Sequence, residues 1–464
     1  MASTLEQRPP RPSAWELRRA LPLMEEALGS PVWIVGGYVR DLLLGRPEAA
    51  DVDLVLERAD AAPAANWLRC HWRRTEPVVA FERYGTAQVS FALEEGGRFT
   101  VELVRARSEA YSPESRKPQV RSATVAEDVR RRDFTVNTLL LGSRGLIQDP
   151  TGMGLRDLRL GVLRTPLEPE ATFSEDPLRM FRAARFAAQM GFRLADGLEE
   201  AMRLSSPRIR IVSVERVRDE LIKLLLAPHP ALGLRLLLGS GLLAETAPEL
   251  AAMAGVAQGG YHLGDVFNHS ALTAELVPPR RVLRLAALLH DVGKPLTVGS
   301  SDSGPTFYRH QQVGAEIARD LLRRLRLPGA EVDQVARLVE LHMRPIQYRP
   351  EWADSAVRRL WHEAGELLPE LLELARADTR ASTFPGTAGL DELEIRLAEV
   401  ARAHPQGLRA PVNGTQLRAW RQLPEGPWIG RALKLLVDAT VAGDLGADGA
   451  TSPEAAFLYL SGHR

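Results

Sequence analysis

The hydrophobic and polar positions follow two different rhythms along the chain. From Pro31 to about Leu163, short runs of β-branched and aromatic residues are separated by turn residues, which is the pattern of strands. The expected strands span residues 32–35, 52–56, 86–93, 98–104 and 135–141. After about Thr165 no strand signal follows, and apolar residues recur at helical spacing almost to the end. The pattern predicts an α+β fold in which a small mixed-sheet head precedes an all-α region.

Helix signals and turn residues divide the chain further. Helices are predicted at 14–29, 174–190 and 213–226, the second with Ser174 as its N-cap and Gly191 directly after its last turn. Proline and glycine cluster between 228 and 262 and again near 405–414, where we expect breaks. We therefore expect four parts, which are a head at 14–163, a helical neck at 164–228, a helical domain at 229–400 and a short helical tail at 401–464.

Composition narrows the class of protein. Of the 464 residues 45% are hydrophobic, and basic and acidic side chains number 59 each, so the chain is globular and has no net basic coat. Any nucleic acid must then be held by local patches. Cys70 is the single cysteine, which excludes a disulfide within the chain and fits a reducing cytoplasm. No apolar run approaches the ~20 residues of a membrane span. We expect a cytoplasmic monomer or homodimer with no membrane partner.

A glycine turn and two aspartates form the first chemical constellation. The Gly36-Gly37 turn follows a predicted strand and opens a helix that bears Arg40. Such a turn lets backbone N–H groups approach a phosphate, although a plain structural turn has the same letters. Further along, Asp51 and Asp53 occupy alternate positions of a predicted strand and therefore project to the same side.

Two carboxylates this close repel each other unless a cation lies between them, and Mg²⁺ prefers oxygen ligands of this kind. Behind a phosphate-binding turn, Asp51 and Asp53 predict a two-metal site for phosphoryl transfer. Glu102, on a later strand, is the candidate for a third catalytic carboxylate. The alternative is that all three are ordinary acids on a solvated strand.

Two further groups of polar residues suggest nucleotide binding. Arg132 ends a run of three arginines and leads into Asp133 and Asn137. Asp133 can accept hydrogen bonds from ribose hydroxyls and Asn137 can bond a phosphate, whereas a solvated basic patch is the alternative.

The predicted helix 174–190 carries a polar stripe in which every third residue is charged: Asp176, Arg179, Arg182 and Arg185. An aspartate acceptor beside an arginine donor fork can read cytosine and adenine, because both place a ring-nitrogen acceptor next to an amino donor. Uracil and guanine present the reversed pattern. The stripe therefore predicts selection of CTP and ATP by protein side chains, with ion pairs on a solvated helix face as the alternative.

Five motifs stand in a fixed order: Gly36–Asp41 with Asp51–Asp53, Arg131–Asn137, Asp149–Leu158, Glu175–Phe186 and Glu215–Leu221. In this order they resemble the class II tRNA nucleotidyltransferase/poly(A) polymerase family of the polymerase β-like superfamily. The resemblance implies Mg²⁺ at Asp51 and Asp53 and triphosphate contacts from Gly36, Gly37 and Arg40. It further implies ribose selection by Asp133 and base reading by Asp176 and Arg179, with Arg182 and Arg185 nearby. It also implies that the polar segment 108–118 is the flexible loop linked in this family to switching from C to A addition.

Histidine and aspartate mark a later block, at His269, His290, Asp291, His310, His342 and Asp378. His290 and Asp291 end an apolar helix, where burying both without a partner would be costly. A metal ion such as Mn²⁺, Ni²⁺, Fe²⁺ or Zn²⁺ resolves this cost. The block resembles the HD phosphohydrolase superfamily, which implies His269, His290, Asp291 and Asp378 as metal ligands. His310 and His342 then serve a second metal or the phosphate.

These observations lead to one expected function, the addition of C and/or A residues from CTP and ATP to the tRNA 3′ end with release of pyrophosphate. The tRNA acceptor end would lie along the helical region, and the HD block would add a phosphohydrolase site. A poly(A) polymerase shares nearly every motif, but such an enzyme usually has a strongly basic C-terminal tail, which residues 440–464 lack. An HD-type hydrolase with an RNA-binding N-terminal part and a non-catalytic RNA-binding protein are the further alternatives.

Overall fold

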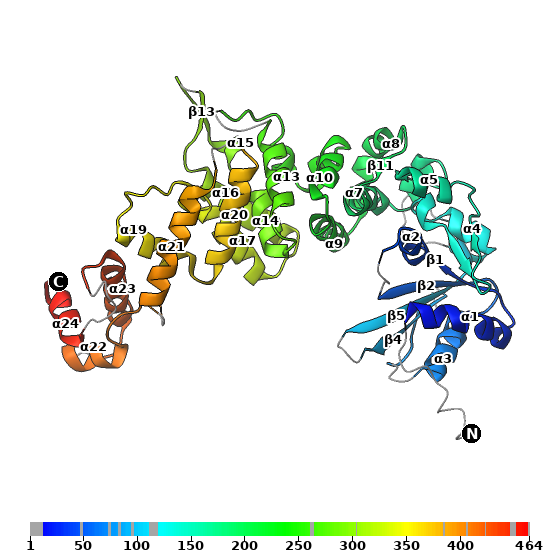
Figure 1. The fold of residues 1–464 in the computed structure, drawn as a ribbon, viewed down its shortest axis with the longest axis horizontal. Helices are drawn as coiled ribbons and strands as arrows, with labels where there is room; N and C mark the ends of the chain where they lie inside the picture. The colour runs from blue at the N-terminus through cyan, green and yellow to red at the C-terminus, as the bar shows by residue number, and fades with distance from the viewer. Residues whose placement is uncertain are drawn as a thin grey trace. The chain divides into compact units, whose positions relative to one another are not determined.

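The chain folds into two compact units in a computed structural model (Figure 1). The first unit comprises Met1–Leu224 with Leu232–Thr246, and the second comprises Leu225–Ala231 with Ala247–Arg464. The structure describes residues 13–46, 50–72, 76–81, 85–93, 97–110, 119–259, 264–302, 304–383, 386–404, 407–422, 424–445 and 452–462. The finer division into head, neck, helical domain and tail stays a prediction.

A mixed sheet of seven strands, in the order β3-β4-β5-β2-β1-β8-β9, forms the centre of the first unit. Its strands are β1 (Val32–Val35), β2 (Asp51–Leu56), β3 (Val79–Phe81), β4 (Thr86–Ala92), β5 (Arg98–Arg105), β8 (Leu140–Gly142) and β9 (Ile147–Gln148). Among the described pairs of this sheet, β2 and β5 run parallel and the others run antiparallel. The predicted α+β class with a mixed-sheet head is confirmed.

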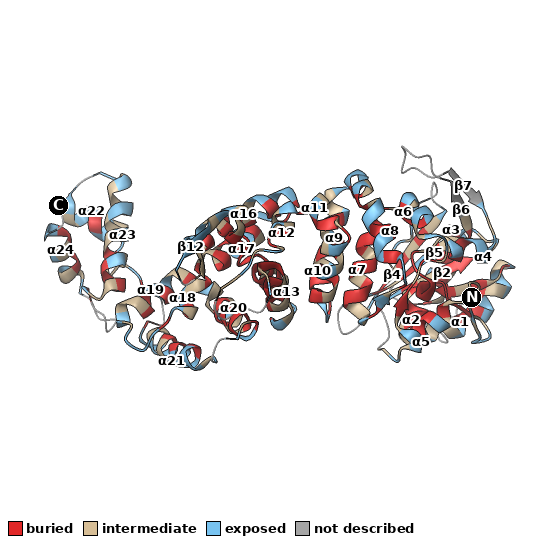
Figure 2. Cartoon of the chain, turned by 90° about the horizontal axis from the view of Figure 1, so that it is seen from above, coloured by how far each residue is buried: buried red, intermediate tan, exposed pale blue. Residues whose placement is uncertain are grey.

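Helices and two small strand pairs complete the first unit. The helices are α1 (Ala14–Leu28), α2 (Gly37–Leu43), α3 (Ala61–His71), α4 (Val125–Arg130), α5 (Gly154–Leu160), α6 (Pro169–Glu175), α7 (Leu178–Met190), α8 (Leu198–Ser205), α9 (Val214–Leu225), α10 (Pro230–Gly239) and α11 (Leu242–Thr246). The strand pairs are β6 (Arg107–Ala110) with β7 (Gln119–Ser122) and β10 (Val162–Leu163) with β11 (Arg193–Leu194). Figure 2 shows buried residues gathered in the sheet and along one side of these helices, as amphipathic elements require.

Two local predictions in the first unit were wrong. Residues 135–141 do not form one strand, because Thr135–Asn137 is a 3-10 turn and β8 begins only at Leu140. Hydrogen bonds from the Phe134 N–H and the Asn137 side chain to the Asp133 carboxylate hold this turn. The segment 174–190, expected as one helix with Ser174 as its N-cap, contains the end of α6 and all of α7, and Ser174 lies inside α6. Pro177 separates the two helices, since the residue before a proline disfavours helical geometry and Asp176 is extended at φ −138° and ψ 101°.

The second unit is helical, with one hairpin. Its helices are α12 (Pro248–Ala251), α13 (Val266–Leu276), α14 (Arg281–Leu289), α15 (Lys294–Thr297), α16 (His310–Arg324), α17 (Gly329–Leu341), α18 (Met343–Ile346), α19 (Asp354–Ala364), α20 (Leu368–Arg380), α21 (Ala388–Ala403), α22 (Gly414–Arg421), α23 (Pro427–Ala442) and α24 (Pro453–Gly462). The hairpin pairs β12 (Val298–Ser301) with β13 (Gly304–Phe307). Together with β11 it corrects the expectation that strands end at Thr165. In the residues described, no helix has the length and hydropathy needed to cross a membrane.

Candidate functional site

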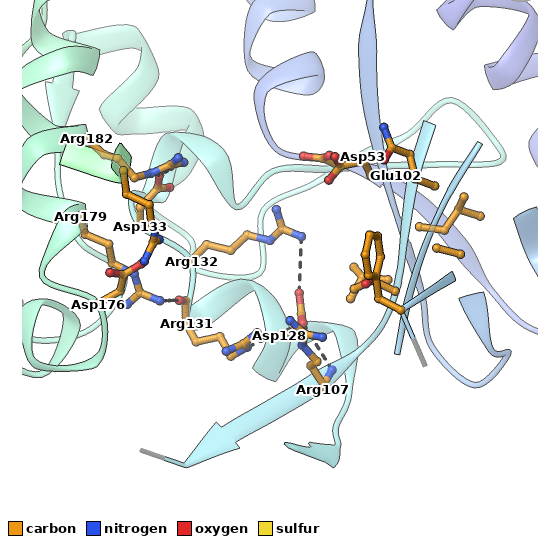
Figure 3. Close-up of a pocket in the computed structure, with 17 residues that line it drawn as sticks. Asp53, Glu102, Arg107, Asp128, Arg131, Arg132, Asp133, Asp176, Arg179 and Arg182 are labelled. Carbon is orange, nitrogen blue, oxygen red and sulfur yellow. Dashed lines mark hydrogen bonds and ion pairs between the residues drawn. The ribbon is translucent and has the colours of Figure 1, made fainter. Parts of the chain in front are cut away.

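A polar cavity of about 440 Å³ lies in the first unit, between the sheet and helix α7 (Figure 3). Asp53 and Glu102 are on one side of it in this view, and Asp176, Arg179 and Arg182 are on the other. From the sequence we expect the acids and the residues that read the base to form one site. The structure brings these five residues to the lining of a single cavity.

Asp53 and Glu102 are direct partners across the parallel strands β2 and β5. Paired residues project to the same face of a sheet, and Asp51 shares that face two residues before Asp53. Burial raises the pKa of both Asp53 and Glu102, and the neighbouring carboxylates raise them further. Carboxylates that destabilise one another in this way suit a divalent cation, so the donor set fits Mg²⁺.

The glycine turn lies directly against this acid pair. Gly36 has φ +81°, a conformation that residues with a side chain rarely adopt. A Cβ atom there would lie 3.1 Å from Asp53 Oδ2 and 3.4 Å from Arg132 Nη1. Glycine is therefore required at this position both for the backbone and for the space beside the carboxylate. Gly37 begins α2, so the first N–H groups of this helix directly follow the turn.

Arg40 is buried and already bonded within the protein. Its Nε and Nη2 donate to the two carboxylate oxygens of Asp41 at 2.9 and 2.8 Å, and Nη1 donates to Asn137 Oδ1 at 2.8 Å. Arg40 is not among the residues that line the cavity. In this structure the Arg40 and Asn137 side chains position the turn, and triphosphate contact by either stays a prediction.

Asp133 is the most strongly bonded acid of the site. Arg182 donates to its Oδ2 from Nε and Nη2, and Asn137 and the Phe134 N–H donate to Oδ1. Burial alone would raise the pKa of Asp133, but Arg182 and these donors lower it to about 2. Asp133 therefore stays ionised at neutral pH and remains an acceptor.

Asp176 and Arg179, the two residues expected to read the base, are held by residues outside helix α7. Arg179 donates to the Arg131 carbonyl oxygen at 2.7 Å and to Glu175 at 2.9 Å, and Arg216 donates to Asp176 at 2.9 Å. These contacts fix the acceptor of Asp176 and the fork of Arg179 on the same wall of the cavity. Arg182 also lines the cavity.

The fourth residue of the predicted stripe lies elsewhere. Arg185 donates to Glu220 at 2.5 Å and stacks over Phe186 at 3.9 Å, and it does not line the cavity. Side chains three residues apart drift by ~60° per step around a helix of 3.6 residues per turn, so these side chains do not share a single face. A direct role of Arg185 in nucleotide binding stays a prediction, and its contacts here support the packing of α9 on α7.

Several lining residues were not predicted, among them Phe81, Arg107, Asp128, Arg131 and Arg216. Asp128 is 3% exposed, accepts from the Arg107 N–H at 3.3 Å and lies 3.5 Å from Arg132 Nη2. It thus connects strand β6 with Arg132. Arg131 and Arg216 both stand in motifs named in the sequence analysis, so the sequence offered a signal for these two residues. Most of the expected flexible loop, residues 111–118, lies outside the described part of the chain.

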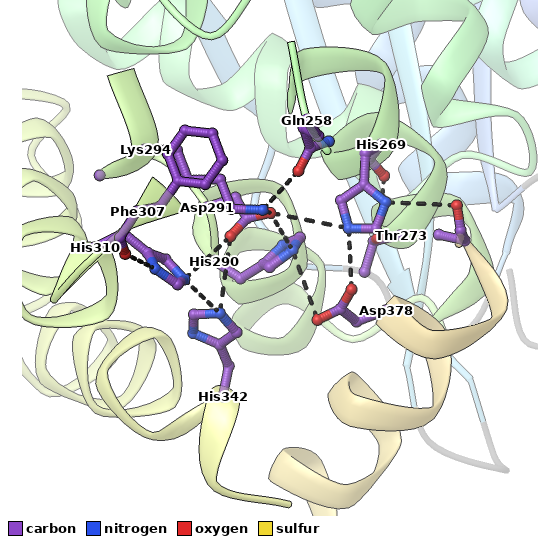
Figure 4. Close-up of polar contacts among 12 residues, drawn as sticks. Gln258, His269, Thr273, His290, Asp291, Lys294, Phe307, His310, His342 and Asp378 are labelled. Carbon is purple, nitrogen blue, oxygen red and sulfur yellow. Dashed lines mark hydrogen bonds and ion pairs between the residues drawn. The ribbon is translucent and has the colours of Figure 1, made fainter. Parts of the chain in front are cut away.

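A second site is built in the second unit by four histidines and two aspartates, as Figure 4 shows: His269, His290, Asp291, His310, His342 and Asp378. All six are at least 90% buried. Two groups have ligand atoms within 4.8 Å of one another, which are His269 with His290 and Asp291, and Asp291 with His310 and His342. Asp291 belongs to both groups, so the arrangement suits two ions with Asp291 between them. In the part of the chain described, the Asp51, Asp53 and Glu102 carboxylates form no group this tight.

The histidine nitrogens are oriented as metal ligands. In His290, His310 and His342 the Nδ1 atom contacts a backbone carbonyl oxygen at 2.7–2.8 Å, which leaves Nε2 free to face the cluster. His310 Nε2 and His342 Nε2 face each other at 3.3 Å. His290 Nε2 is buried without a hydrogen-bond partner, although Asp291 Oδ2 lies 3.1 Å away. Nitrogen lone pairs that converge in this way fit a metal ion.

The electrostatics of the cluster agree with this fit. Burial lowers the pKa of His290, but Asp291 and Asp378 raise it to about 9, so the pocket strongly stabilises positive charge. Asp378 Oδ1 lies 2.9 Å from His269 Nε2, so the cluster also contains a residue 109 positions further along the chain. A cavity of about 470 Å³ opens beside Asp291 and His310, large enough for a small phosphoester.

Comparison with known proteins gives a consistent result. The family described as poly A polymerase head domain matches residues 32–164, the family described as probable RNA and SrmB-binding site of polymerase A matches residues 191–253, and the HD domain matches residues 253–382. The chain is 36% identical to the A-adding tRNA nucleotidyltransferase of Deinococcus radiodurans over 431 residues, which cover 89% of this chain and 92% of the relative. It is 36% identical to the CC-adding tRNA nucleotidyltransferase of Thermus thermophilus over 453 residues, covering 93% and 94%. A solved structure of the Bacillus stearothermophilus CCA-adding enzyme in complex with CTP aligns with a TM-score of 0.65 at 26% identity, over 96% of this chain and 98% of that one.

Proposed function

The chain belongs to the class II tRNA nucleotidyltransferase/poly(A) polymerase family and is a nucleotidyltransferase with an HD domain, and from this premise we propose that it adds C and/or A residues to the tRNA 3′ end. CTP and ATP are the nucleotide donors, and pyrophosphate is released. One observation carries the proposal. The acid pair of β2 and β5 and the base-reading pair beside α7 line one cavity.

The reaction needs a deprotonated ribose oxygen beside the α-phosphorus. The tRNA 3′ hydroxyl attacks that phosphorus in line, and the bond to the β-phosphate oxygen breaks. Bound Mg²⁺ ions would lower the pKa of the attacking hydroxyl and neutralise the leaving pyrophosphate. Asp51 and Asp53, with Glu102 opposite Asp53, would hold the ions. Gly36 lies beside Asp53 and Arg132, and Gly37 follows it, so the triphosphate would bind at this turn.

The base would be selected by the side of the cavity that carries Asp176 and Arg179, opposite the acids. Asp176 accepts the amino proton of cytosine or adenine, and Arg179 donates to the neighbouring ring nitrogen. UTP and GTP would leave both side chains with mismatched partners, which costs much more than a missing contact. Asp133 is ionised and can accept from a ribose hydroxyl, which favours a ribonucleotide.

The test is nucleotide addition by a double variant, Asp51→Ala with Asp53→Ala. We expect loss of labelled CTP and ATP incorporation into tRNA, with an unchanged thermal unfolding transition. Asp60→Ala is a matched control, since Asp60 is an exposed acid that pairs with Arg105. Incorporation retained in the double variant would contradict the metal assignment.

A poly(A) polymerase remains the nearest alternative, and the product separates the two. The curated relatives above add A or CC to tRNA, which favours a short defined addition over a long tail. The chain is equally similar, at 36% identity, to an A-adding and to a CC-adding relative, so an assay must determine which residues this enzyme adds. Primer extension on tRNA lacking one, two or three terminal residues, with CTP and ATP offered separately, distinguishes CCA, CC and A addition.

The HD cluster supports a second proposal, a metal-dependent phosphohydrolase acting on a 2′,3′-cyclic phosphate. Mn²⁺, Ni²⁺, Fe²⁺ or Zn²⁺ would be held by His269, His290, Asp291 and Asp378, and bound metal would activate water and polarise the phosphate. Lys294 lies 2.6 Å from Asp291 and adds a positive charge at the cavity. Turnover of a 2′,3′-cyclic nucleotide that is lost in His290→Ala but kept in Asp51→Ala would establish two independent sites. Loss of this turnover in both variants would contradict the proposal that the two sites are independent.

A further inference from the structure

Phe81 is an exposed aromatic residue inside the nucleotide cavity. It ends β3, the edge strand of the sheet, and its side chain is 49% exposed although it lines the cavity with Asp53 and Glu102. Among the described lining residues it is the one aromatic side chain. An aromatic ring exposed inside a cavity lined by arginines offers a face on which a nucleic-acid base can stack.

The strand register places Phe81 on the face that carries the catalytic acids. One row of paired residues runs Asp53, Glu102, Gln88 and Val79 across β2, β5, β4 and β3. Phe81 follows Val79 by two residues, so both side chains project to that same face. Three interstrand steps of ~4.8 Å separate β2 from β3, roughly 14 Å in all. The ring therefore lies beyond the atoms that react, within reach of a neighbouring nucleotide.

The charges of the cavity indicate which substrate passes this wall. Six arginines line the cavity, at positions 107, 131, 132, 179, 182 and 216, and none of them belongs to β3, β4 or β5. Apart from Glu102, the lining residues on those three strands are uncharged, namely Phe81, Thr86, Ala87, Gln88, Leu103 and Val104. The arginine wall suits the triphosphate and the incoming base. The neutral wall with its aromatic ring suits an unpaired base.

In-line attack requires the acceptor to approach from the side opposite to the leaving pyrophosphate. The incoming base is assigned to Asp176 and Arg179, which lie across the cavity from the acids and the strands that carry them (Figure 3). The acceptor end must then pass the β3–β4 wall to reach the acids.

We propose that Phe81 stacks on an unpaired base at the 3′ end of the acceptor RNA and holds that end beside the catalytic acids. The inference rests on the proposed function, since it names the place of the second substrate. Stacking on an aromatic side chain contributes to binding of single-stranded nucleic acid irrespective of base identity. The terminal base of the acceptor changes as residues are added. Stacking on Phe81 suits such an end, because it does not depend on which base is present.

The test measures RNA affinity without nucleotide, so that it does not depend on catalysis. A tRNA acceptor minihelix that ends in two unpaired cytidines is compared with the same duplex ending blunt. Phe81→Ala should weaken binding of the overhanging RNA about 5- to 100-fold and leave blunt RNA unchanged. Phe81→Trp should keep the affinity. Val79→Ala is the matched control, because Val79 is also 49% exposed on β3 but does not line the cavity.

Two further measurements locate the stacked base and exclude another role. An abasic residue at the stacked position should remove the difference between the native protein and Phe81→Ala. In steady-state addition, Phe81→Ala should raise KM for RNA and leave KM for CTP and ATP unchanged. Equal affinity of both proteins for the overhanging RNA would overturn the proposal. So would a raised nucleotide KM with an unchanged RNA KM, which would assign the ring to the incoming base.

Discussion

Arg182 donates two hydrogen bonds to one carboxylate oxygen of Asp133, from Nε at 2.8 Å and from Nη2 at 2.5 Å. The pair joins helix α7 to the turn that follows α4, so the helix that bears Arg179 is tied to the segment that carries Arg131 and Arg132. A buried ion pair of this kind fixes relative position more than it adds stability.

This pair has a pH dependence whose direction is set by the pKa of Asp133. In the folded protein that pKa is about 2, below the value of 3.8 for a free side chain. The unfolded chain therefore binds the proton first as pH falls. The ionised Asp133 carboxylate contributes roughly 2 kcal/mol to the free energy of unfolding. This contribution is complete above about pH 4 and is lost as the pH falls toward 2.

Urea unfolding from pH 7 to pH 3 checks this expectation on the native protein and Asp133→Asn. The variant should be less stable at pH 7, and the difference between the two proteins should shrink toward pH 3. A difference that stays constant with pH would assign the loss to packing instead of charge.

Glu102→Gln should separate stability from activity. Because the pKa of Glu102 is raised in the folded protein, ionised Glu102 makes the fold less stable above that pKa than a neutral residue would. The melting temperature of ligand-free Glu102→Gln should equal or exceed that of the native protein. Nucleotide addition should fall on the order of 100-fold or more, because a ligand of the metal site is lost. A variant that melts lower and keeps its activity would contradict the third-carboxylate assignment.

The strands around the acids were predictable because their signals are local. Alternation of apolar and polar residues in 98–104 places Glu102 on one face, and the same rule places Asp51 with Asp53. The alternation rule does not predict that β2 pairs with β5, because 41 residues separate Leu56 from Arg98 and the pairing depends on how that connection folds.

The wrong predictions have equally specific causes. Asp133 and Asn137 stand in a sequence with high strand propensity, but the Asp133 carboxylate accepts from both the Phe134 N–H and the Asn137 side chain, which holds this segment in a turn. Asp176 has helical neighbours on both sides, but Pro177 prevents continuity. For the HD cluster, residue types indicated a metal, whereas the contact between His269 and Asp378 spans 109 residues and follows from helix packing.

Arg216→Gln should relax the choice of base. Arg216 donates to Asp176 Oδ2 at 2.9 Å, so the variant removes one of the hydrogen bonds that hold the carboxylate expected to accept from the base. The Leu178 N–H still donates to Asp176 Oδ1. We expect KM for CTP and ATP to rise about 10-fold or more, in line with a charged hydrogen bond, and the ratio of UTP to CTP incorporation to increase. Arg218→Gln on the same helix is the control, since Arg218 pairs with Asp219 and does not line the cavity. An unchanged UTP to CTP ratio would show that Asp176 is held without Arg216.

Gly36→Ala should abolish nucleotide addition because the added Cβ would crowd Asp53. A second glycine with positive φ, Gly29, separates this effect from backbone strain. Both Gly36 and Gly29 have positive φ, at +81° and +57°, so alanine strains either backbone by about 1–3 kcal/mol. At Gly29 a Cβ meets no atom within 4 Å, whereas at Gly36 it lies 3.1 Å from Asp53 Oδ2. Both variants should melt at lower temperature, but only Gly36→Ala should lose activity at a temperature where both are folded. Equal activity of the two would contradict close contact between the turn and the acid.

His342→Gln should remove bound metal from the HD cluster without affecting nucleotide addition. His342 Nε2 lies 3.3 Å from His310 Nε2 and 3.8 Å from Asp291, so it belongs to the group on the His310 side of Asp291. Burial and the positive charge at His290 lower the pKa of His342 to about 3, which keeps it neutral and able to bind metal at physiological pH.

The measurement is metal content per chain after loading with Mn²⁺ or Ni²⁺ and gel filtration, alongside turnover of a 2′,3′-cyclic nucleotide. His404→Gln is the matched control, because His404 is also buried, at 7% exposed, but is not a member of either ligand group. We expect at least one metal equivalent and the cyclic phosphodiesterase turnover to be lost in His342→Gln and kept in His404→Gln. CTP incorporation should be the same in all three proteins, since its acids lie in the other unit. Unchanged metal content in His342→Gln would mean that the four histidines do not share ions as their geometry indicates, and the hydrolase proposal would then lose its support.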